Sequence, residues 1–172
     1  MDAERDDPAA IAWFARAGQP WSPAESQAVD ALIRSWPALT GAAVSVVGGA
    51  EAAAALLRSA VFDDAWWDEE EAVREELWLA ASHTITEADL ERRLAADGER
   101  WRAVARDAAR RAFGTDPELA ADAAVALVLA AHQRTLAALA GAADDHVFVR
   151  KLALFAAGRW PLGYHRGRFH VF

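Results

Sequence analysis

The sequence of 172 residues contains no cysteine, which excludes disulfide bonds, thiolate nucleophiles and cysteine-ligated metals. This absence fits a reducing compartment. Long apolar runs are also missing. The longest, Ala123 to Ala131, is far short of the roughly 20 residues that span a bilayer. Residues 1–7 are acidic and polar, where a secretory signal would be basic and then apolar. We therefore expect a cytoplasmic protein without a membrane partner.

Motifs of the common enzyme classes are lacking as well. The chain has no Gly-x-Ser-x-Gly nucleophile turn and neither of the glycine-rich patterns that bind dinucleotides or triphosphates. It has no Glu-x-x-His pair, as di-iron bundles require, and no His-Glu-x-x-His zinc motif. The sequence thus predicts no catalytic residue, no cofactor and no metal ligand, and it favours a protein that is not an enzyme without deciding the question.

Lysine is nearly absent, since 17 of the 18 basic residues are arginine. Together with the abundance of alanine, this bias indicates a GC-rich bacterial genome and says nothing about mechanism. With 54% hydrophobic and 26% charged residues the chain falls in the globular range. Its length suits one domain, residues 1–172, with one core. Because alanine buries little area, we expect the eight tryptophans to supply much of the core's bulk.

Acidic residues are missing from the last part of the chain. Residues 1–145 hold all 26 acids and 13 basic residues, whereas residues 146–172 hold five basic residues and no acid. The basic, aromatic tail could bind an anion such as a phosphate, a nucleotide or a carboxylate. The candidate ligand-binding residues are Arg159, His165, Arg166, Arg168 and His170. Alternatively, the tail docks onto the protein's own acidic helices. A net charge of −8 argues against general nucleic-acid binding.

Helix signals cover most of the chain. Capping residues and apolar spacing predict helices at about 8–18, 22–36, 51–60, 65–84, 117–140 and 144–158, and another that starts at Thr86 and extends at least to Ala108. The predicted N-caps are Asp7, Ser22, Thr86 and either Asp144 or Asp145, and Thr115-Asp116-Pro117-Glu118 is the start signal of the helix at 117–140. Asp97-Gly98 could break the helix that starts at Thr86 in two. The helix of residues 117–140 is apolar almost all round, which predicts a central, enclosed position. Residues 40–50 fit either a short strand or a loop.

The C-terminal residues 159–172 alternate apolar and polar side chains about a His-Arg-Gly turn, which predicts a β-hairpin. An isolated hairpin is marginal in water, so we expect it to pack on the helices. The predicted fold is therefore mainly α: a helical bundle of about six or seven helices with a short C-terminal β-hairpin.

Three further groups of residues are candidate sites. His132 shares a helical stripe with Val125, Leu129 and Leu136, so it is expected to be partly buried and is more often structural than a general base. Glu69, Glu76 and His83 share one helix edge, but the two glutamates are interpreted as part of a solvated acidic run. The arginines between Arg92 and Arg111 are interleaved with acids and are interpreted as a solvated face.

Two functional hypotheses follow. The first is a non-enzymatic interaction protein of the adaptor or immunity type, which an exposed Trp21, Trp67 or Trp160 would support because tryptophan is enriched at interface hot spots. The second is a protein or enzyme that binds a small anion on the C-terminal hairpin. The free edge of that hairpin could also pair with a second copy in a homodimer.

Overall fold

The computed structural model describes residues 8–59 and 62–172, and within these ranges the fold is mainly α, as predicted. The six α-helices are α1 (Pro23–Arg34), α2 (Ala50–Arg58), α3 (Asp64–Ser82), α4 (Glu87–Phe113), α5 (Pro117–Leu139) and α6 (Val147–Ala156). The three strands are β1 (Ala43–Val46), β2 (Pro161–His165) and β3 (Arg168–Val171). None of the helices in the described ranges is both long and apolar enough to cross a bilayer.

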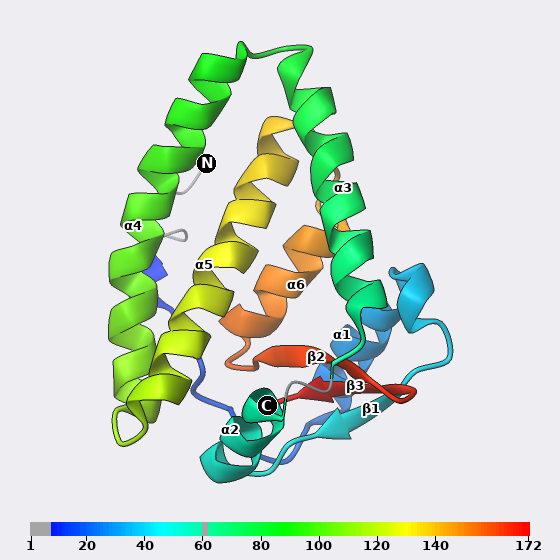
Figure 1. Ribbon diagram of the computed structural model, residues 1–172, viewed down its shortest axis with the longest axis vertical. Coiled ribbons are helices and arrows are strands. Elements are labelled where there is room, and N and C mark those ends of the chain that lie inside the picture. Colours follow the sequence, from blue (N-terminus) through cyan, green and yellow to red (C-terminus); the bar gives the residue numbers. More distant parts are fainter. Residues whose placement is uncertain (1–7, 60–61) are drawn as a thin grey trace.

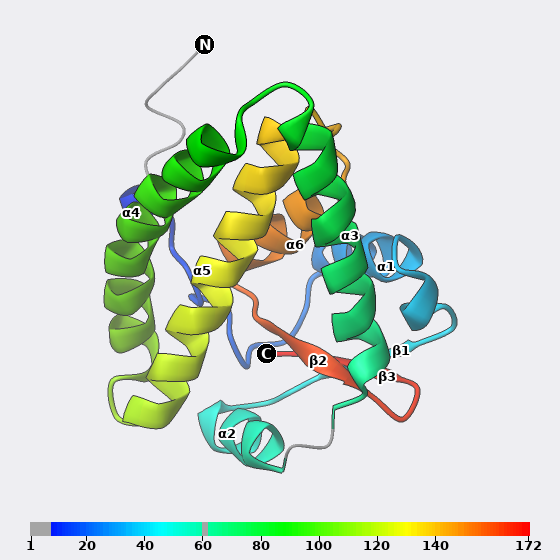
Figure 2. The same ribbon diagram turned by 45° about the horizontal axis from the view of Figure 1, so that its top comes forward.

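Helix α5 lies between α3 and α4, with α6 behind it, so it occupies the middle of the helical layer (Figure 1). Figure 2 shows the same order after a 45° turn, with the small sheet and α2 at one end of the helices. Leu127, Ala130, Ala131 and Leu136 on α5 are inaccessible to solvent. The predicted central position of this helix is therefore correct, although one of its sides remains open.

The C-terminal hairpin is one part of a three-stranded sheet of order β1-β3-β2. Strands β2 and β3 pair antiparallel around Arg166 and Gly167, which both have positive φ, as a tight hairpin turn requires. Strand β1 adds to β3 in parallel, with Val44 opposite Phe169. Residues 43–46 are therefore a strand. Because β1 covers one edge of β3, that edge is closed to a second copy.

The sheet packs on the helices through one face. Phe169 and Val171 are fully buried there, and the ring of Phe169 meets Trp66 of α3 edge-on at 5.1 Å. Trp160 and Phe172 bond to each other through both backbone N–H groups and add two more buried rings. The expected packing of the hairpin against the helices is thus observed.

From α1 onward, the helix boundaries follow the capping signals with two exceptions. Ser22 and Glu25 form the predicted capping box of α1. Helix α4, however, runs unbroken through Gly98, because the Asp97 carboxylate accepts a hydrogen bond from Thr135 on α5 at 2.6 Å and caps no new helix. Helix α6 begins after His146, whose Nδ1 accepts the Phe148 N–H, so neither predicted aspartate is its cap.

The segment before α1 was predicted as a helix and is instead a 3-10 turn at Pro8–Ala10 followed by irregular turns. Trp13 and Phe14 are nevertheless both buried. Phe14 has a φ of 61°, and Trp13 donates its indole N–H to the Pro8 carbonyl at 2.6 Å. The predicted cap Asp7 lies outside the described residues.

Candidate functional site

The structure does not bring the five candidate residues of the C-terminal hairpin into one cluster. Arg159 precedes β2 and is fully buried. Its guanidinium donates to Glu25 at 3.0 Å and to the backbone carbonyls of Arg16, Gln19 and Pro20 at 2.5–2.9 Å. All three of its nitrogens are thus engaged by the segment before α1 and by α1. Arg159 links this segment to the sheet, and because its side chain is fully buried it does not reach an external anion.

Glu25 is the acidic partner in this cluster. Burial alone would raise the pKa of Glu25, but hydrogen bonds from Arg159 and Ser22 and the nearby positive charge outweigh it, and the pKa falls to about 2. Arg16 also lies 2.9 Å from the same carboxylate. The Arg159–Glu25 pair is therefore a structural ion pair that stays charged at neutral pH.

Three of the other candidates lie on the sheet face turned away from the packed rings. The register places His165 opposite Arg168, with His170 two residues further along β3. Arg168 is exposed, and the two histidines are half-buried. Burial, together with the charges of His165 and Arg168, lowers the pKa of His170. The centroid of the Phe62 ring lies 6.3 Å from that of the His170 ring, so Phe62 covers part of this face.

Arg166, the fifth candidate, is exposed at the hairpin turn. The other two basic residues of the acid-free segment pair with acids. Arg150 lies 3.6 Å from Asp145 and donates to the Ala31 carbonyl at 3.1 Å, and Lys151 bonds to Glu70. Three of the five basic residues of the acid-free segment, Arg150, Lys151 and Arg159, therefore pair with acids of the same chain.

The tryptophans give the interaction hypothesis little direct support. Trp160 is buried, Trp21 is half-buried, and only Trp67 among the eight lies on the surface, with 36% of its area exposed. Trp21 stacks under Arg159, whose guanidinium carbon is 5.4 Å from the ring. Most of the tryptophans do supply core volume, as the sequence predicted.

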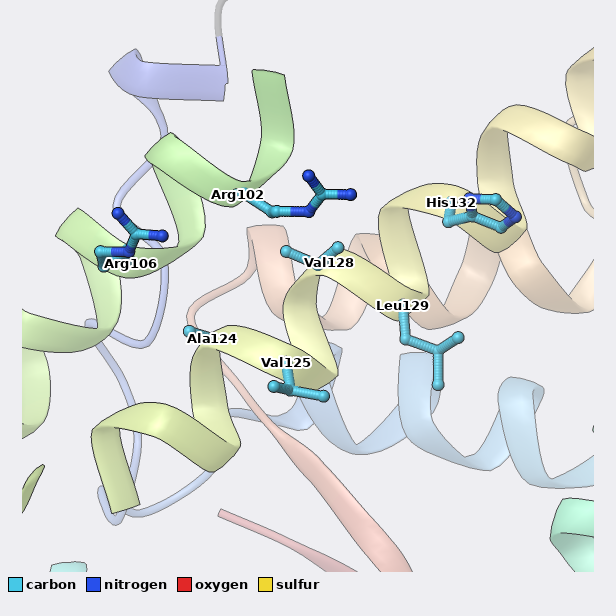
Figure 3. A pocket seen from close by; sticks show the side chains of 7 residues that line it. All are labelled: Arg102, Arg106, Ala124, Val125, Val128, Leu129 and His132. Carbon is cyan, nitrogen blue, oxygen red and sulfur yellow. The ribbon is translucent and has the colours of Figure 1, made fainter. Parts of the chain in front are cut away.

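A site that the sequence did not indicate lies between α4 and α5. We call it the α4–α5 groove. It has a volume of about 570 Å³ and is lined by Arg102, Arg106, Ala124, Val125, Val128, Leu129 and His132. Figure 3 shows the two arginines projecting from α4, with Val128 turned toward Arg102 and with Val125 and Leu129 pointing away from α4. The groove therefore has an apolar floor along α5 and a basic wall on α4.

The floor of this groove carries the most exposed large apolar residues of α5. Val125 is 69% exposed and Leu129 is 41% exposed, although they share their helix with fully buried Leu127 and Leu136. Both residues had been predicted to lie on a buried stripe, and that expectation is wrong. The reason is geometric: α3 and α4 diverge on either side of α5, so no helix covers its outer side (Figure 1).

The charge of the groove comes from arginine. Burial and the neighbouring Arg74 lower the pKa of His132, so its imidazole is neutral at pH 7. Arg102 pairs with Glu99 on the same helix, whereas Arg106 has no ion-pair partner among the described residues. His132 is therefore a half-buried neutral side chain in the wall of the groove. The arginines of α4 had been interpreted as a solvated face, but two of them, Arg102 and Arg106, line the groove.

A second feature missed in the sequence is a buried ion pair beneath the other side of α5. Lys151 of α6 bonds to Glu70 of α3 at 2.5 Å, and Gln133 of α5 donates to the same carboxylate at 3.1 Å. All three side chains are buried. Burial lowers the pKa of Lys151, and Glu70 opposes that effect in part. The single lysine among 18 basic residues was the available signal, while Glu70 looked like one acid in a solvated run.

The edge formed by Glu69, Glu76 and His83 separates in the structure. Glu69 accepts the Ala38 N–H at 2.6 Å and so holds the segment after α1, whereas Glu76 and His83 are exposed. Across residues 8–59 and 62–172, no group of three histidines or acids is arranged to hold a metal ion.

Comparison of the chain with models of protein families, with curated proteins and with solved structures finds no match. Function must therefore be inferred from the surface and from its chemistry.

Proposed function

We propose that this protein is a non-enzymatic interaction protein that binds an acidic, amphipathic helix of a partner protein in the α4–α5 groove. The observation that carries the proposal is the exposure of Val125 and Leu129 on the central helix of the bundle. Large apolar side chains that remain exposed next to a groove are typical of protein-binding surfaces.

The shape of the groove favours a helix as the occupant. Its α5 residues recur along about two turns, from Ala124 to His132, which corresponds to about 12 Å of helix axis. Helices that dock in grooves present anchors at i, i+3, i+4 and i+7, a spacing of similar length. Arg102 and Arg106, one turn apart on α4, would flank such a helix on one side.

The charge of the groove favours an acidic partner. The protein as a whole carries a net charge of −8, yet its groove is lined by two arginines and by no carboxylate. Complementary charge at an interface raises the association rate and selects the partner. A basic helix would meet like charge at Arg102 and Arg106, so it would be rejected.

The test uses two designed helical peptides with the same apolar i, i+3, i+4, i+7 pattern, one with glutamate and one with lysine at the flanking positions. Binding of the labelled peptides is measured by fluorescence anisotropy at low salt. We expect the acidic peptide to bind at least tenfold more tightly than the basic one. The double variant Arg102→Glu/Arg106→Glu should abolish this preference or reverse it.

Arg93→Glu is the matched control. Arg93 lies nine residues before Arg102 on α4, which places it on the opposite side of the helix. It should therefore leave peptide binding unchanged. Equal binding of the two peptides, or equal effects of the control and the double variant, would refute the proposal. Light scattering of the protein alone would show whether a second copy occupies the groove, which would also contradict it.

A further inference from the structure

On the other side of Val125 and Leu129 lies a second cavity, which we call the Lys151 pocket. It has a volume of about 380 Å³, is partly open to solvent, and is lined by residues of α2, α3, α5, α6 and the start of β2. Its walls are aromatic and aliphatic, with Phe62, Trp67, Phe155, Trp160 and Leu162 among the lining residues. Lys151 supplies the only cationic group of the lining, and Asp122 supplies the only acid.

The hydrogen bonding of Lys151 is incomplete. An ammonium group has three N–H donors, but within the described part of the chain Nζ makes one hydrogen bond, to Glu70. Its other neighbours are the rings of Trp66 and Trp67, with centroids 5.0 and 5.9 Å from Nζ. The side chain lines the pocket but is only 4% exposed, so its remaining donors meet little bulk water. A buried donor without an acceptor costs free energy, and an oxygen placed in the pocket would recover it.

We propose that the Lys151 pocket binds a small, uncharged, mainly aromatic molecule whose carbonyl oxygen accepts a hydrogen bond from Lys151 Nζ. The volume of the pocket is within the range of small-molecule sites, and its lining has the usual composition of such sites, apolar walls with one oriented polar group. The site shares Val125 and Leu129 with the α4–α5 groove, but neither arginine of the groove lines it, and it does not depend on the function proposed for the groove.

The Glu70 carboxylate decides between a neutral and an anionic ligand. At 2.5 Å from Nζ it already balances the charge of Lys151. A ligand carboxylate would place a second negative charge in the same buried space, with no further cation among the lining residues to compensate it. A carbonyl oxygen accepts the free N–H without adding charge. The second carboxylate at the pocket, Asp122, is exposed and adds to the repulsion of an anion.

Three probes of nearly equal shape test this chemistry: acetophenone, benzoate and ethylbenzene. Their affinities are compared by competition against 4′-fluoroacetophenone in ligand-observed ¹⁹F NMR. We expect acetophenone to bind about tenfold or more tightly than either ethylbenzene, which lacks the acceptor, or benzoate, which adds the charge. Equal affinities for acetophenone and ethylbenzene, stronger binding of benzoate, or no binding of any probe would overturn the proposal.

The single lysine provides a direct readout in the unaltered protein. With ¹³C-labelled lysine the only lysine side-chain signals are those of Lys151, and acetophenone should shift its Cε resonance while ethylbenzene does not. An unchanged resonance at saturating acetophenone would count against the proposal. The variant Glu70→Gln/Lys151→Met, which removes both charges together, should lose the advantage of acetophenone over ethylbenzene. The groove variant Arg102→Glu/Arg106→Glu should retain it, so failure here is distinct from failure of the function proposed for the groove.

Discussion

Lys151 Nζ and Glu70 Oε1 lie 2.5 Å apart between α6 and α3, and each of the two side chains is about 95% enclosed by protein. A buried ion pair adds little net stability compared with an apolar pair of similar volume, because both charges lose their hydration. Removing only one partner is a different matter, since the other charge then remains buried alone. The pair thus makes α3 and α6 dependent on each other.

The variant Lys151→Met should be strongly destabilised. It leaves the Glu70 carboxylate buried without a counter-charge, which costs about 3–5 kcal/mol. The free energy of unfolding from urea titration measures the effect. The double variant Glu70→Gln/Lys151→Met should recover most of that loss, because no isolated charge remains. A double variant as unstable as the single one would show that packing of the lysine stem matters more than charge.

The Arg159–Glu25 ion pair should make stability depend on pH in the acid range. Glu25 has a pKa of about 2 in the folded protein against an ordinary value of 4.5, so the folded state is favoured by the ionised form. The contribution is fully present above about pH 5 and is lost as the pH falls toward 2. We expect it to be on the order of 2 kcal/mol. Urea titrations of the wild type and of Glu25→Gln at pH 7 and pH 3 should show the difference between them shrinking at the lower pH.

Gly158→Ala should destabilise the protein more than Gly141→Ala does. Both glycines have positive φ, 85° and 73°, so each substitution incurs the left-handed penalty of about 1–2 kcal/mol. A Cβ at Gly158 would also lie 2.8 Å from the Arg16 backbone nitrogen, whereas a Cβ at Gly141 meets no atom within 4 Å. Thermal unfolding of the two variants measures the difference, and equal losses would contradict the close approach of residues 16 and 158.

Truncations along α5 should distinguish its buried side from its open side. Leu127→Ala removes a fully buried side chain and should cost about 2–5 kcal/mol, whereas Leu129→Ala, at a residue 41% exposed, should cost about 1 kcal/mol or less. Both changes remove the same atoms from the same helix. Urea titration of the pair provides the measurement. A large loss at Leu129 would mean that this side of α5 is covered in solution, for instance by a second copy.

Much of the fold could be read from local signals. The capping box at Ser22 and Glu25, the start signal of α5 at residues 115–118 and the hairpin turn at Arg166-Gly167 involve residues close in sequence, so their chemistry is visible in the chain itself. Predictions failed where a distant residue competes for a local group. Asp97-Gly98 was expected to interrupt α4, but the helix is continuous there and the Asp97 carboxylate accepts a hydrogen bond from Thr135 on another helix.

The sequence alone determined the helical class, the position of most elements and the mid-layer location of α5, because apolar periodicity and capping act within a few residues. Only the tertiary structure decided which charged side chains are paired within the protein. Arg159 was proposed to bind a ligand, but it is fully buried and donates hydrogen bonds to Glu25 and to three backbone carbonyls. Tertiary structure likewise decided that Glu70 is buried and that Val125 is exposed. Burial depends on which neighbours cover a side chain, and the divergence of α3 and α4 around α5 is set by packing across the whole chain.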